Sequence, residues 1–285
     1  KETWLILLSN YKKCKLLVLG ANSFIGKNFL KNTKYENITA TYYLKVPSIK
    51  FVKKKYKYKK INIKNYQEVI KIIKNECIDV IINFTADNNN RIEQSMSIRN
   101  IFDLNLLGFI NLVEAVKNLN KKIIIYNFTS TEVDNNKLSP YSLSKQTSEK
   151  IQKIYNNLYK MKINSIKLNN IFGPGDMNFS RLIPFICKNF CEDKSIDLYS
   201  LKKNKIFKFT YIDDLINFID DKIKENKSKN SVKKIKFYKY SALNIYKMLS
   251  KLHINYFLKN HSSVSTNNNI ENKLYSTLKW YKKNL

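Results

Sequence analysis

The chain has 285 residues, a hydrophobic fraction of 44% and a formal net charge of +30 at pH 7. This length suffices for one full α/β domain with a smaller lobe beside it. No apolar run reaches the roughly 18–20 residues that a membrane span requires, and the apolar run 4–8 is too short for a secretory signal. We therefore expect a cytoplasmic protein with no membrane partner.

The positive charge comes almost entirely from lysine, because the only arginines are Arg91, Arg99 and Arg181. Sites that read nucleic-acid bases or grip phosphates in a fork depend on arginine. The lysines are spread along the whole chain among Asn, Ile and Tyr, as on solvated faces. We therefore expect no nucleic-acid partner, with a role toward other anionic partners as the alternative. The densest run, 53–60, indicates a solvated loop or an edge strand.

The cysteines, Cys14, Cys77, Cys187 and Cys191, are too few for the disulfide framework of a secreted domain. The last two are one helical turn apart, which is not the CxxC spacing of a zinc site. Since the chain also has only 2 histidines, we expect no metal site.

Apolar runs predict buried parallel strands at 15–19, 38–43, 61–63, 79–84, 122–128 and 163–168. Helical patterns lie between them, at 27–31, 66–75, 101–119 and 141–160. Strands that alternate with helices at this spacing predict an α/β fold with a doubly wound parallel Rossmann sheet.

After 173–175 the pattern loosens, with helical patterns at 183–190, 215–223 and 243–252 and a strand pattern at 207–212. This stretch is too irregular for a second Rossmann unit. We therefore predict a Rossmann domain over 14–172 and a small substrate-binding lobe over 173–285 that partly returns to the Rossmann domain. The lobe is expected to cover the carboxyl ends of the strands, where open α/β sheets bind ligands.

A glycine turn, Gly20-x-x-Ser23-x-x-Gly26, stands at the first strand–helix junction. Gly20 permits a tight turn, and Gly26 lets the following helix pack close to the strand. The helix N-terminus then offers free N–H groups to a pyrophosphate. Ser23 replaces the middle glycine, although its hydroxyl can donate a hydrogen bond to phosphate. A plain strand–helix turn is the alternative interpretation.

A second motif, Tyr141-x-x-x-Lys145, puts both side chains on one face of a helix. Ser139 and Pro140 suit the N-cap and the first position of that helix. A nearby ammonium stabilises a phenolate and lowers the pKa of a tyrosine, which lets the pair move a proton at neutral pH. Chance spacing is the alternative, since the chain has 19 tyrosines. The position of the pair, directly after the fifth predicted strand and 129–133, favours the catalytic interpretation.

An ordered set of segments resembles the extended short-chain dehydrogenase/reductase family, the NAD(P)-dependent sugar-nucleotide epimerases, dehydratases and reductases. The matching segments are the glycine motif 19–26, the fourth strand 79–86, the N-x-x-G helix 105–115, the serine strand end 128–133, the Y-x-x-x-K helix 140–149, the R-x-x-N-x-Y-G-P-G segment 166–175, the F-x-Y-V-x-D segment 209–214 and the last helix 278–281. The resemblance covers about residues 14–285, and its strength lies in the ordered set.

The resemblance implies that Ser130 polarises a substrate carbonyl, that Tyr141 is the acid/base and that Lys145 binds the nicotinamide ribose. The other residues implied at the cofactor are Gly20, Asn22, Ser23, Phe24, Ile25, Gly26, Lys45, Asn62, Phe84, Thr85, Ala86 and Asn105, the last within a supporting hydrogen-bond network. The residues implied at the substrate are Thr131, Glu132, Asn169 and Lys208.

Several departures from the family pattern bear on which of the family's reactions this chain catalyses. Lys167 stands where arginine is expected, and Phe207-Lys208 stands where an arginine usually clamps a diphosphate, so that Lys208 is a weak substitute. The short segment 131–140 between Ser130 and Tyr141 is typical of compact reductase-like members. Dehydratases carry Asp-Glu where this chain has Thr131-Glu132.

We therefore expect an NAD(P)-dependent reductase or epimerase that acts on a nucleotide-linked 4-keto sugar for surface polysaccharide. The alternatives are a sugar-nucleotide 4,6-dehydratase, a non-catalytic protein that senses dinucleotides, and a polyanion-binding protein.

The second predicted strand ends without the carboxylate that binds the ribose of NAD, because no Asp or Glu occurs between residues 37 and 67. Lys45 or Lys50 can neutralise a 2′-phosphate there. We therefore expect NADP, with NAD possible. The resemblance also implies a homodimer, in which helices 101–119 and 141–160 pack against a symmetry mate.

Overall fold

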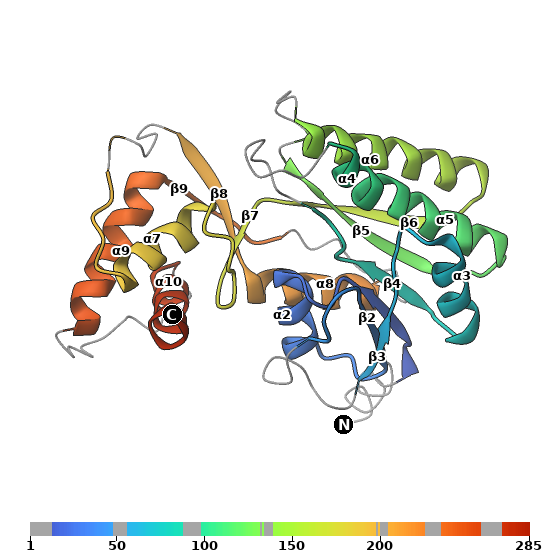
Figure 1. The fold of residues 1–285 in the computed structure, drawn as a ribbon, viewed down its shortest axis with the longest axis horizontal. Helices are drawn as coiled ribbons and strands as arrows, with labels where there is room; N and C mark the ends of the chain where they lie inside the picture. The colour runs from blue at the N-terminus through green and yellow to red at the C-terminus, as the bar shows by residue number, and fades with distance from the viewer. Residues whose placement is uncertain are drawn as a thin grey trace. The chain divides into compact units, whose positions relative to one another are not determined.

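The computed structural model describes residues 13–47, 56–87, 98–131, 133, 139–197, 199, 205–225, 235–257 and 270–285. The chain divides into two compact units, of which the first ends at Leu168 and the second begins at Asn169. Figure 1 shows the elements of both units in sequence colours.

A parallel sheet forms the centre of the first unit. Its strands are β1 (Leu16–Leu19), β2 (Ile38–Tyr42), β3 (Lys57–Lys60), β4 (Val80–Asn83), β5 (Ile124–Ser130) and β6 (Lys162–Leu168). They lie in the order β3-β2-β1-β4-β5-β6, with every neighbouring pair parallel. The strand order reverses between β1 and β4, which is the switch point where such sheets bind ligands. The predicted doubly wound α/β fold is confirmed.

Helices cover both faces of this sheet. They are α2 (Phe24–Asn32), α3 (Tyr66–Asn75), α4 (Ile98–Phe102), α5 (Gly108–Asn118) and α6 (Pro140–Leu158). Helices α3, α5 and α6 lie over one face, whereas α2 lies over the other (Figure 1).

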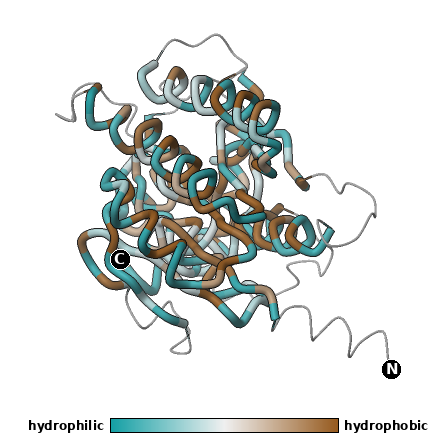
Figure 2. Tube along the Cα trace, turned by 90° about the vertical axis from the view of Figure 1, so that its right-hand side faces the viewer, coloured by the Kyte–Doolittle hydropathy of each residue, from teal (hydrophilic) through white to brown (hydrophobic). Residues whose placement is uncertain are grey.

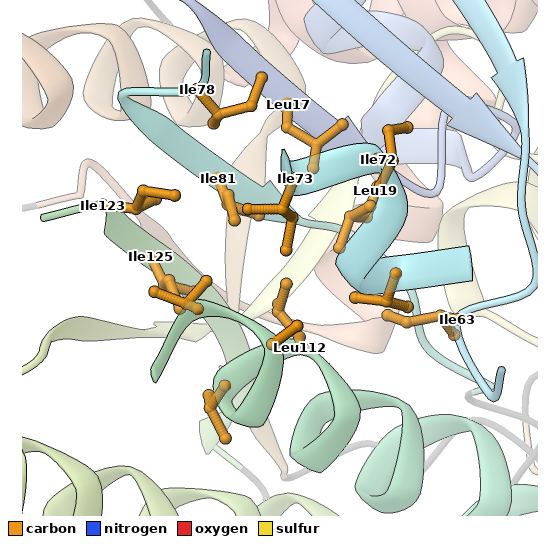
Figure 3. Close-up of a cluster of buried hydrophobic side chains, with 14 of the residues drawn as sticks. Leu17, Leu19, Ile63, Ile72, Ile73, Ile78, Ile81, Leu112, Ile123 and Ile125 are labelled. Atoms are coloured by element: carbon orange, nitrogen blue, oxygen red, sulfur yellow. The ribbon is translucent and has the colours of Figure 1, made fainter. Parts of the chain in front are cut away.

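Figure 3 shows the core between α3, α5 and the strands. Leu17 and Ile81 of the strands are fully buried there against Ile73 and Leu112 of the helices. On the other face of the sheet, the ring centres of Phe29 in α2 and Phe84 are 5.5 Å apart. The Phe84 ring in turn stacks on the Phe128 ring, with 4.8 Å between their centres. Alternate residues of the central strands β1 and β4 therefore enter the two cores, which explains their continuous apolar runs.

The third strand lies at a different place in the sequence from the one predicted. The run 61–63 was expected to form it, but β3 comprises Lys57–Lys60, inside the lysine-rich run. Among the described strands it pairs with β2 alone, at the edge of the sheet, and its lysines are exposed. Charged lysines are tolerated on an edge strand and discourage pairing with other chains. The alternative interpretation of the run as an edge strand is thus confirmed for these residues.

The predicted helix 101–119 is interrupted in the structure. It consists of α4, a π-helical turn η2 (Asp103–Leu107) and α5. A π turn inserts one residue into the helical spacing, which rotates the side chains that follow and often marks a functional site. Here the turn has the buried Asn105 at its centre.

The second unit contains a mixed sheet in the order β7-β8-β9. Its strands are β7 (Asn170–Phe172), β8 (Ile206–Tyr211) and β9 (Tyr238–Ser241), and its helices are α7 (Leu182–Cys191), α8 (Ile212–Glu225), α9 (Ala242–Phe257) and α10 (Ile270–Asn284). The buried Asp176 joins two of its segments, because it pairs with Arg181 at 3.3 Å while its carbonyl accepts a hydrogen bond from the Tyr281 hydroxyl. Within the described residues, this sheet combines a parallel and an antiparallel strand pair, unlike the parallel sheet of the first unit.

Figure 2 shows teal and brown residues interleaved along the helices, as in amphipathic helices with one face buried. Among the described helices, none has the length and apolar character needed to cross a membrane. Within the described ranges, no group of three or more His, Cys, Asp or Glu side chains is placed to hold a metal ion.

Candidate active site

The glycine turn follows β1, and the surrounding backbone requires both of its glycines. Gly20 has a φ of +80°, and a Cβ there would lie 2.9 Å from the backbone of Phe84 and Thr85. A Cβ on Gly26 would collide with the carbonyl oxygen of Gly20. The turn can therefore approach β4 and α2 only because these positions lack side chains.

Ser23 caps the helix that begins at this turn. Its hydroxyl oxygen accepts a hydrogen bond from the Gly26 N–H at 2.9 Å. The first N–H groups of a helix have no intrahelical partner, so those of Phe24 and Ile25 are left as donors at the positive end of the helix dipole. These two donors fit a pyrophosphate. Ser23 caps α2 at the position where the usual dinucleotide-binding turn has its middle glycine.

The loop after β2 is fastened to the same turn. The Ala21 N–H donates to the carbonyl of Thr41 at 2.9 Å, and the side-chain amide of Asn22 donates to the carbonyl of Lys45. The exposed Lys45 is thereby held beside the glycine turn. Asn62, after β3, accepts a hydrogen bond from the Lys64 N–H at 3.1 Å.

The end of β4 lies next to the turn, as the close approach of Gly20 to Phe84 and Thr85 shows. The Thr85 N–H donates to Asn83 Oδ1 at 3.1 Å, and Asn83 donates in turn to Asn127 of β5 at 3.0 Å. Both asparagines are buried. Their hydrogen bonds fix the strand ends from which Thr85 and the exposed Ala86 project.

Tyr141 and Lys145 lie in the first turns of α6. The helix begins at Pro140 with a capping box between Ser139 and Ser142. Lys145 is 3% exposed, and its Nζ donates to the carbonyl of Phe128 at 3.0 Å. The same Nζ lies 6.0 Å from the centre of the Tyr141 ring.

The burial of Lys145 changes its acid strength, because desolvation lowers the pKa of its ammonium from the usual 10.5 to about 8. Lys145 is therefore still mainly protonated at neutral pH, close to a tyrosine whose phenolate it can stabilise. Ser130, half-buried, is the last residue of β5 and lies two positions after Phe128, whose carbonyl binds Lys145.

The residues expected at the substrate fall into three groups. Thr131 Oγ1 donates to the carbonyl of Leu168 at 3.3 Å, whereas Glu132 lies outside the described residues. Asn169 and Lys208 belong to the second unit. Asn169 Oδ1 is buried with no hydrogen-bond partner among the described residues, and Lys208 Nζ lies 5.4 Å from the centre of the Phe237 ring.

The spacing of the R-x-x-N pattern indicates one further candidate residue. Counted from Lys167, the asparagine of the R-x-x-N pattern is Asn170, which donates to the carbonyl of Lys208 at 3.1 Å.

Lys167 stands at the arginine position of the same pattern, and its Nζ lies 3.7 Å from Oε2 of Glu149 in α6. The lysine that replaces the expected arginine therefore still forms an ion pair.

The comparisons with known proteins concern the family and the fold of the chain. The model of the NAD dependent epimerase/dehydratase family matches residues 16–235. Protein CapI of Staphylococcus aureus is 26% identical over 240 residues, which cover 76% of this chain and 71% of that protein. UDP-glucuronate 4-epimerase of Thermodesulfobacterium geofontis is 28% identical over 179 residues, which cover 56% of this chain and 52% of that protein.

Among solved structures, the UDP-glucuronic acid 4-epimerase of Bacillus cereus, in complex with UDP-glucuronic acid and NAD, is similar with a TM-score of 0.73. The match covers 94% of this chain and 99% of that one, at 20% sequence identity. At this identity the likeness concerns the fold.

The burial of Lys145 predicts a pH-dependent stability. Between about pH 8 and 10.5 the unfolded chain binds more protons at this position than the folded chain, so the free energy of unfolding rises with pH across that window. Relative to Lys145→Met, the wild-type protein without added nicotinamide should gain about 2–3 kcal/mol from neutral pH to about pH 10. Urea unfolding of both proteins at several pH values measures this gain. A constant difference between them would contradict the burial.

Proposed function

The chain belongs to the NAD-dependent epimerase/dehydratase family, and we propose from this that it is an epimerase that acts at C4 of a nucleotide-linked sugar. The family consists of nicotinamide-dependent enzymes of the extended short-chain dehydrogenase type. The observation that carries the proposal is the pair of Tyr141 and the buried Lys145 beside the end of β5. The similarity to UDP-glucuronate 4-epimerase supports C4 as the reacting centre. We place the reaction in the cytoplasm, in the supply of sugars for surface polysaccharide.

When bound, the nicotinamide cofactor supplies reversible hydride transfer. The Tyr141 phenolate then accepts the proton of the sugar 4-hydroxyl, and the phenol so formed returns this proton once the ketone is reduced from its other face. Lys145 keeps a positive charge near the Tyr141 ring, which lowers the cost of the phenolate. Ser130 donates a hydrogen bond to the same sugar oxygen and stabilises the charge that develops on it.

The presence of a threonine at position 131, in place of an acidic residue, argues against a dehydratase. Elimination of water requires an acid where this chain has Thr131, and a hydroxyl is a much weaker acid than a carboxyl group. The Thr131 hydroxyl also donates to the carbonyl of Leu168. A 4-ketosugar reductase is the second candidate, since the short segment 131–140 resembles compact reductases.

A panel of UDP- and dTDP-sugars and their 4-keto derivatives, each with added NAD or NADP in both redox states, tests the proposal. An epimerase interconverts the two C4 epimers with no net change in nicotinamide absorbance. A reductase consumes reduced nicotinamide in proportion to the 4-keto sugar. Absence of both conversions across the panel would contradict the proposed function.

Catalysis should depend on Tyr141 much more than folding does. Tyr141→Phe removes only the hydroxyl, so we expect an unchanged melting temperature and turnover lower by roughly 10²- to 10⁴-fold. Tyr159→Phe, at the other end of α6 and 50% exposed, is the matched control and should keep wild-type turnover. Equal turnover of the two variants on the true substrate would remove Tyr141 from the mechanism.

We propose that the cofactor is NADP in preference to NAD, with NAD also accepted. Asn22 holds the carbonyl of Lys45, which brings a cation to the glycine turn. The first acid that follows Lys45 in the sequence, Glu68, accepts a hydrogen bond from the Asn62 N–H at 2.7 Å. A 2′-phosphate at the end of β2 would therefore meet a cation where the site for NAD usually has a carboxylate.

The preference predicts that NADPH binds more tightly than NADH and that Lys45→Glu reverses the order. Fluorescence titration of both reduced cofactors at physiological salt measures the two dissociation constants. Lys31→Glu makes the same change of charge in the last turn of α2, away from the glycine turn, and should leave the order unchanged. Tighter binding of NADH by the wild-type protein would overturn the preference.

We propose that the enzyme is a homodimer that pairs through the helices α4 to α6. Large apolar side chains are exposed on them: Ile98, Leu107, Leu143, Ile154 and Leu158, at 42–69%. Apolar side chains that gather on the outer faces of neighbouring helices commonly mark an interface, and an isologous two-fold contact is the commonest kind.

Light scattering at micromolar concentration should give twice the mass of the chain. Ile154→Asp places a charge on the proposed interface and should shift the mass toward that of the monomer. Ile254→Asp is its control, because Ile254 is similarly exposed on α9, at 54%, outside the proposed interface. A monomeric wild-type protein would contradict the dimer.

A further inference from the structure

Ser144 is a fully buried hydroxyl that joins two parts of the candidate active site. It lies on α6 between Tyr141 and Lys145 and is 0% exposed. Its Oγ accepts a hydrogen bond from Asn105 Nδ2 at 3.1 Å and donates one to the carbonyl of Tyr141 at 2.8 Å. No water can replace either partner without entering the core, so the two bonds depend on this side chain.

Asn105 is held from the other side by the segment that follows β4. Its Oδ1 accepts a hydrogen bond from the Asp87 N–H at 2.8 Å, and its Nδ2 donates to the Asp87 carbonyl at 2.9 Å. The π-helical turn η2 presents this side chain to the interior. The amide group of Asn105 therefore makes three hydrogen bonds, two to Asp87 and one to Ser144.

These contacts form a continuous connection. It runs from Asp87, one residue beyond the cofactor-binding candidates Phe84, Thr85 and Ala86, through Asn105 and Ser144 to the backbone of Tyr141. A serine within a helix commonly donates to a carbonyl one turn earlier. Ser144 does so and in addition accepts a bond from outside its helix, which fixes the first turn of α6 against the segment after β4.

We propose that Ser144 is a positioning residue, which sets the place of the Tyr141 side chain by tying its backbone to Asn105 and Asp87. This inference rests on the function proposed above for Tyr141. Because Tyr141 must lie within hydrogen-bond distance of the sugar oxygen, a small shift of its helical turn lowers the rate of proton transfer without weakening the binding of substrate.

Ser148 offers a matched comparison one turn further along α6. It is also 0% exposed, and its Oγ donates to the carbonyl of Lys145 at 2.8 Å, three residues earlier. Ser144→Ala and Ser148→Ala therefore remove the same kind of local hydrogen bond at the same burial. They differ in that Ser144→Ala also removes the acceptor of Asn105.

We expect Ser144→Ala to lower kcat by about 10- to 100-fold with little change in KM, on the scale known for a displaced catalytic group. Ser148→Ala should keep a kcat close to that of the wild-type enzyme. If Ser144 acts through Asn105, the fall in kcat of the double variant Asn105→Ala/Ser144→Ala should be smaller than the product of the two single effects. Equal kcat values for Ser144→Ala and Ser148→Ala, or purely multiplicative effects, would overturn the proposal.

A second measurement does not require turnover. The ultraviolet titration of the Tyr141 phenol, taken as the difference between each protein and its Tyr141→Phe counterpart with NADP⁺ added, reports how near the phenol lies to Lys145. Ser144→Ala should shift the midpoint to higher pH, and Ser148→Ala should not, whereas equal midpoints would count against the proposal. If the wild-type enzyme converts no sugar in the panel, the proposed function fails, while the titration still tests Ser144.

Discussion

The hydrogen bond from the buried ammonium of Lys145 to the carbonyl of Phe128 ties α6, which carries the proposed catalytic pair, to the sheet. A lysine that is 3% exposed must have a partner, since an unpaired buried charge is strongly unfavourable. The partner is a backbone atom of β5, and side-chain variation cannot remove it. This bond sets the first turns of α6, which carry Tyr141, against the end of β5, where Ser130 is the last residue.

The same edge of the sheet gathers the remaining candidates. Parallel strands all end at one edge, and the residues after β1, β2, β4 and β5 meet there. Gly20 permits the first of these ends to approach Phe84 and Thr85, and Asn22 binds the loop that carries Lys45. The parallel arrangement of the strands thus brings the candidate cofactor-binding residues and the candidate catalytic residues to the same edge of the sheet.

Lysine and serine substitutions distinguish this chain from its family without breaking the local structure. Lys167 keeps an ion pair with Glu149 in place of the expected arginine, and Ser23 becomes a helix cap in place of a glycine. The lysine keeps the positive charge of its position, and the serine adds a side-chain hydrogen bond that a glycine cannot form. The excess of lysine is therefore compatible with an ordinary enzyme fold, as its spread over solvated faces indicated.

The sequence by itself determined the buried strands, the glycine turn and the common face of Tyr141 and Lys145, because each depends on neighbours a few residues away. It misplaced β3, since an edge strand with one covered face needs no apolar run. Only the tertiary structure decided that Lys145 bonds to Phe128 and that Asn105 meets Ser144, 39 residues along the chain. Such partners depend on how strands and helices pack, and no local pattern of residues indicates which distant residues will come into contact.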